Sequence, residues 1–173
     1  MSMHSRPDPS SYPHAVARYI TNVPEGDLIR LLQEQLDHTI QQLSSISASQ
    51  EQFRYAEGKW SLREVVGHII DFERIISYRA LRFSRGDQKN LFGFEENDYV
   101  RESRYSSASL ASLIEELKAV RTSSIHLLSR FTQQDWDKTG KVEGNEISVQ
   151  ALAYTLCGHW LHHLQIILSR YLT

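Results

Sequence analysis

The sequence has little of three things that would each suggest a particular class of protein. It contains one cysteine among 173 residues, so no internal disulfide can form, and we expect the reducing environment of the cytoplasm. No stretch approaches the roughly 20 apolar residues that span a bilayer, so we expect no membrane partner. The net charge is only −2 and no basic stripe is present, which argues against nucleic acid as a partner.

The composition does provide enough apolar residues for one core. Hydrophobic residues make up 40% of the chain and charged residues 23%, which is typical of a globular protein and not of a disordered one. A chain of this length fits one domain and can bury roughly 70% of its unfolded surface. Residues 1–23, with several prolines and serines, are expected to be a loose N-terminal lead-in. Residues 24–173 are expected to form a single domain.

Hydrophobic periodicity indicates an all-α protein. Apolar residues recur three and four positions apart in four segments, at about 27–47, 61–85, 109–131 and from 148 almost to the end. Each segment has about 21 to 25 residues, so we predict a four-helix bundle.

The ends and connections of these helices also leave signals. Ser61 and Glu64 predict a capping box at the start of the second helix, and Gly86 predicts its end. The connection over residues 86–107 between the second and third helices is long, and such connections often cover a site or carry function. Residues 141–147 suggest a short hairpin before the last helix.

The sequence is rich in histidine, with eight residues, and two of them share a face of the last helix. His159 and His163 are four residues apart on the stripe that should face the core. His162 falls on a stripe with Thr155 and Gly158 that should face solvent. Buried imidazoles are costly unless their nitrogens are satisfied, and a spacing of four lets a helix present both to one metal ion. The alternative is a pair of hydrogen-bonded core histidines.

His68 provides a third candidate ligand, on the apolar stripe of the second helix. Three imidazoles without a carboxylate would form an open site that suits zinc, nickel or iron and leaves a position for a small molecule. A metal held there would acidify a thiol or water and so generate a nucleophile near neutral pH. Three core histidines without any metal remain the alternative.

Three further residues near this stripe have open roles. Asp71 lies one turn from His68 and is either a hydrogen-bond partner of an imidazole or a surface aspartate. Arg79 could bind an anionic group of a substrate or extend to solvent from the end of the bundle. Cys157 cannot reach the same metal as His159 from a regular helix, so we expect a buried, unreactive side chain. The other histidines are expected to face solvent or make single hydrogen bonds: His4, His14, His38 and His126.

Several motifs together resemble the DinB-like (DinB/YfiT-type) metalloprotein superfamily, which is unrelated to the translesion polymerase of similar name. The resemblance extends from about residue 28 to the end. It rests on Trp60-Ser61 with Glu64, Gly67-His68, Glu73-Arg74, the run 78–83 and the closing run 158–164. It implies a four-helix bundle, often a homodimer, with a divalent metal held by His68, His159 and His163.

The resemblance also limits the possible functions. Members of the family transfer low-molecular-weight thiols such as bacillithiol or mycothiol, or use such a thiol in isomerisation, and many have no assigned substrate. The leading hypothesis is therefore an enzyme in which zinc or nickel activates a thiol that attacks a small electrophile. The alternatives are a metal-dependent hydrolase and a non-catalytic, stress-associated metal-binding bundle, because no carboxylate other than Asp71 is expected near the histidines.

Overall fold

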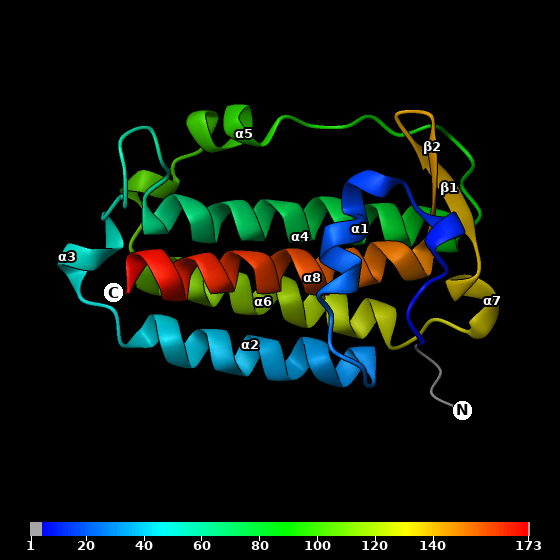
Figure 1. Cartoon of the computed structure of the whole chain (residues 1–173), viewed down its shortest axis with the longest axis horizontal. Coiled ribbons are helices and arrows are strands. Elements are labelled where there is room, and N and C mark those ends of the chain that lie inside the picture. Colours follow the sequence, from blue (N-terminus) through cyan, green and yellow to red (C-terminus); the bar gives the residue numbers. More distant parts are fainter. Residues whose placement is uncertain (1–4, 173) are drawn as a thin grey trace.

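The computed structural model describes residues 5–172 and has four long helices packed side by side (Figure 1). This confirms the predicted all-α four-helix bundle. The long helices are α2 (Leu28–Ser44), α4 (Leu62–Ser84), α6 (Leu110–Leu128) and α8 (Val149–Ile166), and a π-helical turn, Ile167–Tyr171, extends the last of them. No helix in the described part of the chain is both long and apolar enough to cross a membrane.

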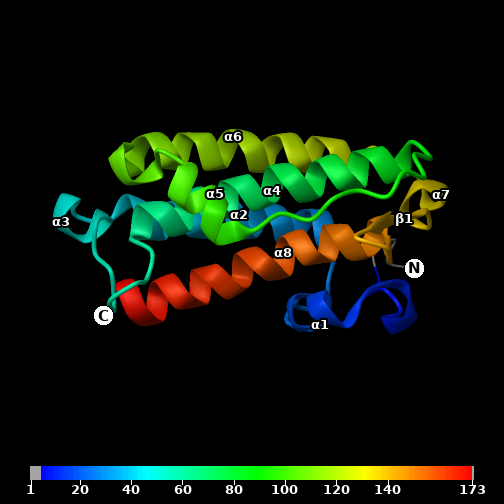
Figure 2. The same cartoon turned by 90° about the horizontal axis from the view of Figure 1, so that it is seen from above.

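The helices do not pack in the order of the sequence. Both α2 and α4 pack against α6 and α8, so α2 and α4 occupy opposite corners of the bundle. The colours in Figures 1 and 2 show that α4 and α6 run in one direction and that α2 and α8 run in the other. The connection between α4 and α6 makes this possible, because it returns along the bundle to the end where α4 began (Figure 1).

The predicted helix ends agree with the structure. The Ser61 hydroxyl accepts a hydrogen bond from the backbone N–H of Glu64, and the Glu64 carboxylate accepts one from the backbone of Ser61, which completes the capping box. Gly86 follows the C-cap of α4 with φ of 80°, a conformation that glycine adopts without steric cost. At the start of α8, the Ser148 hydroxyl caps the backbone N–H of Ala151.

Short elements join the long helices. The predicted hairpin is present as β1 (Thr139–Val142) paired antiparallel with β2 (Asn145–Ser148). Glu143 and Gly144 form its two-residue turn and both have positive φ, as a type I′ turn requires. The other short pieces are α3 (Ala48–Glu51), α5 (Glu96–Glu102), α7 (Gln133–Trp136) and the 3₁₀ turns Pro9–Ser11 and Tyr105–Ser107.

The N-terminal segment is more ordered than the sequence analysis expects. Residues His14–Thr21 form α1, which lies on the outer side of α8 (Figure 2). Ile20 is fully buried, and a Cβ atom on Gly158 would lie 1.9 Å from the carbonyl oxygen of Tyr19. The expectation that the stripe of Thr155, Gly158 and His162 faces solvent is therefore wrong, because α1 covers it. His4 lies outside the described residues.

The hydrophobic core consists of two clusters along the bundle. Between them, on α2, α4 and α6, three polar side chains are buried at matching levels: Gln35, Glu73 and Arg121. The bundle therefore contains a polar layer that divides its apolar interior.

Candidate metal centre

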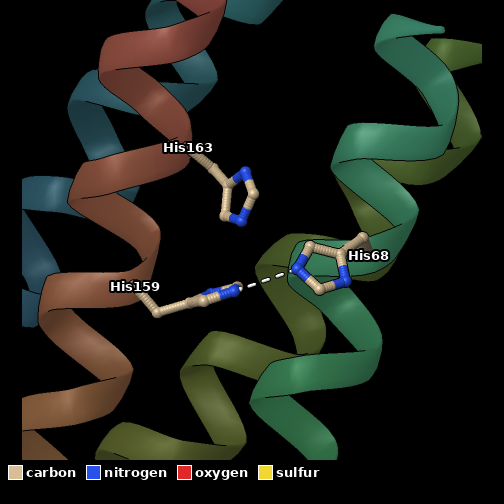
Figure 3. Close-up of side chains that lie close together, drawn as sticks. All are labelled: His68, His159 and His163. Carbon is tan, nitrogen blue, oxygen red and sulfur yellow. Dashed lines mark hydrogen bonds between the residues drawn. The ribbon is translucent and has the colours of Figure 1, made fainter. Parts of the chain in front are cut away.

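Three imidazoles meet inside the bundle, from two antiparallel helices (Figure 3). His68 comes from α4, and His159 and His163 come from successive turns of α8. One ring nitrogen of each lies within 4.8 Å of those of the other two, and none of the three residues is more than 9% exposed. The structure thus brings together the three histidines that the sequence analysis selected.

Neighbouring aromatic rings fix the positions of these imidazoles. The Phe72 ring, one turn from His68 on α4, stacks parallel to the His159 ring with a centroid distance of 3.5 Å. The Trp60 ring, next to the capping box of α4, lies 4.8 Å from the His68 ring. Packing against aromatic rings therefore fixes the imidazoles of His68 and His159.

The hydrogen bonds of this cluster leave most of its nitrogens free. The Nε2 atoms of His68 and His159 are 2.9 Å apart, so one donates to the other. His163 makes no hydrogen bond within residues 5–172. Burial lowers the pKa of His68 to about 4 and that of His163 to about 2, and it lowers the pKa of His159 well below its usual value. The rings are therefore neutral at pH 7, as a metal ligand must be, and the donor set fits a divalent ion.

Two segments outside the long helices flank the cluster. Tyr19 of α1 makes edge contacts with His159 and with the half-buried His162, at centroid distances of 5.3 and 5.7 Å. Glu96 of α5 places Oε2 at 3.8 Å from Nε2 of His68. Glu96 could not be predicted from sequence, because α5 lies in the long connection, where no hydrophobic period indicates a helix.

A cavity of about 230 Å³ opens beside the imidazoles. His163 lines it, together with Trp60 and Val65 at the start of α4 and Asn97 of α5. The other lining residues lie in the segment before α4 and at the C-terminal end of α8. Its lining includes one cation, Lys59, and three aromatic residues: Tyr55, Trp60 and Tyr171. A small molecule with polar and apolar parts could therefore reach the imidazoles through this cavity.

The remaining candidates lie away from the imidazoles. Asp71 accepts a hydrogen bond of 2.6 Å from the hydroxyl of Tyr105, and within the described residues its carboxylate makes no hydrogen bond to an imidazole. Arg79 lies three turns further along α4, at a second cavity. Cys157 is buried, which raises the pKa of its thiol to about 11, so it is an inert core residue as expected. His14, His38 and His126 are exposed.

The polar layer contains a second cluster that the sequence analysis missed. The Arg121 guanidinium donates to Glu73 Oε2 and to Gln35 Oε1, each at 3.0 Å, and lies 3.9 Å above the Trp160 ring. The Gln35 amide in turn donates to the backbone carbonyl of Cys157. One arginine thus connects all four long helices. In the sequence, the only sign of this cluster was Arg121 itself, a positively charged residue four positions after Leu117, on the face of α6 that points to the core.

Comparison with known proteins gives a family and a fold. The sequence profile of the DinB superfamily matches residues 31–167. The structure is similar to that of YfiT from Bacillus subtilis, described as a "probable metal-dependent hydrolase with an unusual four-helix bundle topology", with a TM-score of 0.74 and 18% identity over 92% of this chain and 94% of that chain. It is also similar to a mycothiol-dependent maleylpyruvate isomerase, with a TM-score of 0.66 and 12% identity over 83% of this chain and 61% of that one. No curated protein matches the sequence.

Proposed function

Because the chain belongs to the DinB superfamily, we propose that it is a metal-dependent enzyme that directs a small-molecule thiol against an electrophilic substrate. One observation carries the proposal: three neutral, buried imidazoles converge beside a cavity, and within the described residues one hydrogen bond, between His68 and His159, is all that their nitrogens make. When bound, a divalent metal lowers the pKa of a thiol or water beside it, so that a nucleophile forms near neutral pH.

The chain supplies no sulfur of its own to this site. Its one cysteine is buried on α8, away from the imidazole cluster, with a raised pKa. The sulfur would therefore arrive with a cosubstrate, through the cavity beside His163. The mycothiol dependence of the similar isomerase supports a thiol of low molecular weight. Lys59 in the cavity lining could pair with a carboxylate where the thiol carries one, as bacillithiol does.

The protein groups around the imidazoles would position the reactants. His68, His159 and His163 would hold the metal, with zinc or nickel as the metals best suited to three imidazoles. Glu96 Oε2 is placed to accept the proton that the thiol gives up, because it lies at the edge of the cluster and is half exposed. The rings of Phe72 and Trp60 would keep water away from the inner side of the site.

The first test is the metal content of untagged protein. We expect close to one zinc or nickel ion per chain by elemental analysis, and none in a His159→Ala variant.

The second test follows consumption of bacillithiol or mycothiol with 1-chloro-2,4-dinitrobenzene as the electrophile. Activity should require His159 and persist in Cys157→Ala, because the sulfur comes from the cosubstrate. Thiol consumption that is equal in wild type and His159→Ala would refute the proposal.

A hydrolase that activates water at the same imidazoles is the second candidate. The similarity to YfiT over nearly the whole of both chains favours it. It predicts metal-dependent cleavage of 4-nitrophenyl acetate without any thiol and no turnover of the thiol pair. Binding of one metal ion with neither activity would instead support a non-catalytic metal-binding bundle.

The resemblance to the family also leads us to propose a homodimer. Exposed aromatic side chains, among them Tyr78 and Phe92, are available for such a contact. Light scattering over a concentration series should then give about twice the mass of 20.0 kDa, and a constant monomer mass would refute the dimer.

A further inference from the structure

A second and larger cavity, of about 480 Å³, lies over the other half of α4. It is enclosed by α4 and by residues 89–94, which follow the helix and are held by Leu91, whose backbone pairs with the hairpin strand β1. Three cations line it, Arg79, Arg82 and Lys89, and no aspartate or glutamate is among its described lining residues. The volume is typical of a small-ligand site, and its charge is opposite to that of the whole chain.

Arg79 is the unusual member of this set. Its side chain is only 9% exposed, and its Nη2 donates a hydrogen bond of 2.8 Å to the backbone carbonyl of Phe92. Within the described residues no carboxylate oxygen lies within 4 Å of it, and Glu143 acts on it only from a greater distance. Its Nε and Nη1 make no hydrogen bond within the described residues, and its side chain lines the cavity. A buried guanidinium without a counterion is costly, and an anion in the cavity would complete it.

The walls of the cavity indicate what kind of anion fits. The guanidinium of Arg79 lies 5.9 Å from the centre of the Phe94 ring, and the Tyr99 ring lies 5.1 Å from that of Phe94. Arg82 is already engaged by Asp87 and by the Tyr78 hydroxyl, and Lys89 is exposed to solvent, so Arg79 is the buried cation with nitrogens to spare. A planar guanidinium fork matches a carboxylate, and aromatic walls match a flat apolar group. We propose that this cavity binds a small organic carboxylate with a flat apolar body, held by Arg79.

This site is separate from the imidazole cluster and goes beyond the proposed function. Arg79 follows His68 by 11 residues, three turns of helix, so both lie on the same face of α4, about 16 Å apart. Phe72 and Ile75 occupy that face between them. Binding at Arg79 therefore requires neither the metal nor catalysis, and the two proposals can fail independently.

Calorimetric titration of the full chain with trans-cinnamate tests the proposal. We expect saturable binding of one cinnamate per chain. Cinnamamide has the same shape without the charge and should bind at least tenfold more weakly. Arg79→Gln should weaken cinnamate binding at least tenfold. Arg85→Gln removes the same charge next to α4 outside the cavity, and His159→Ala removes a candidate metal ligand, so both should bind cinnamate within twofold of the wild type.

Several results would overturn the proposal. The proposal is wrong if cinnamate shows no saturable binding at millimolar concentrations, or if cinnamamide binds as tightly as cinnamate. It is also wrong if Arg79→Gln leaves cinnamate binding unchanged, or if inorganic phosphate binds more tightly than cinnamate. A tenfold loss of cinnamate affinity in His159→Ala would overturn the separation of the two sites.

If circular dichroism shows that Arg79→Gln does not fold, Lys89→Glu takes its place, because Lys89 is exposed and lines the cavity. That charge reversal should weaken cinnamate binding about threefold, and unchanged binding would count against the proposal.

Discussion

The imidazole cluster and the Arg121 network are both buried polar groups, but their internal pairing differs. In the Arg121 network a cation is paired with a carboxylate and an amide, and the contacts reach all four long helices. In the imidazole cluster the three side chains are of one kind, come from only two helices and share one hydrogen bond.

This difference separates a structural role from a binding role. In the Arg121 network the opposite charges of Glu73 and Arg121 neutralise each other, although Glu73 Oε1 and Arg121 Nε make no hydrogen bond. Neutral imidazoles offer lone pairs that no neighbouring group takes up, so a cation from outside is what would satisfy them. Polar burial alone therefore does not identify a ligand site, and we expect a ligand only where like neutral groups are buried next to a cavity.

The largest expected effect is the loss of stability when the Arg121 network is broken. Glu73→Gln leaves the buried guanidinium of Arg121 without its counter-charge, so the free energy of unfolding should fall by about 3–5 kcal/mol in urea denaturation. The control Arg74→Gln breaks the more exposed ion pair with Glu116 and should cost less than about 1 kcal/mol. If both substitutions cost the same small amount, the network does not have the structural role assigned to it.

Removal of metal should destabilise the protein through the imidazole cluster and leave the Arg121 network unaffected. With free metal at about 100 times its dissociation constant, a chelator should destabilise the wild type by about 3 kcal/mol, seen as a lower thermal midpoint. His159→Ala should show no response to the chelator, whereas Glu73→Gln should keep the full response. A wild-type midpoint that is the same with and without chelator would remove the distinction between the clusters.

The substitution Gly158→Ala tests whether α1 packs on α8 next to the imidazole cluster. The new Cβ would collide with the backbone of Tyr19, so we expect a loss of about 1–3 kcal/mol and faster proteolysis of α1. In a chain that lacks residues 1–23 the collision is absent, and the same change should stabilise α8 by about 1 kcal/mol.

The truncated chain also tests the prediction that residues 24–173 form a single domain. We expect it to keep its helical circular dichroism and a cooperative unfolding transition. A destabilising effect of Gly158→Ala in both chains would show that Tyr19 is not the residue it disturbs.

The smallest expected effect concerns Asp71, at the edge of the bundle. Asp71→Asn weakens the hydrogen bond from Tyr105, and because the pair is half exposed we expect a loss of about 1 kcal/mol in urea denaturation. Metal affinity should not change, because Asp71 contacts Tyr105 and not an imidazole. A tenfold loss of metal affinity by competition with a chromogenic chelator would instead make Asp71 a partner of a metal ligand, as the sequence allowed.

The regular parts of the molecule could be predicted from sequence because their signals are local. The capping box at Ser61, the stop at Gly86 and the hairpin turn each depend on a few adjacent residues, and helical periodicity placed three histidines on inward faces. Periodicity gave the face of each side chain but not its partners across the bundle. The convergence of His68 with the α8 pair therefore needed the antiparallel packing of α4 and α8.

The parts that escaped prediction depend on contacts between distant segments. The stripe around Gly158 looked solvent-exposed because its covering helix, α1, is short and preceded by prolines. Arg121 looked like an ordinary arginine because its partners lie 86 and 48 residues away, on α2 and α4. Glu96 approaches His68 only because the long connection returns along the bundle.

The diagonal placement of α2 and α4 has a consequence for how the chain is made. A ribosome releases α1 and α2 first, yet α1 packs on α8, and α2 packs on α6 and α8. Neither N-terminal helix can complete its packing until the last helix has left the exit tunnel. The imidazoles are also divided between α4 and α8, so the centre cannot assemble before α8 has emerged, and the earlier helices keep part of their apolar faces uncovered until then.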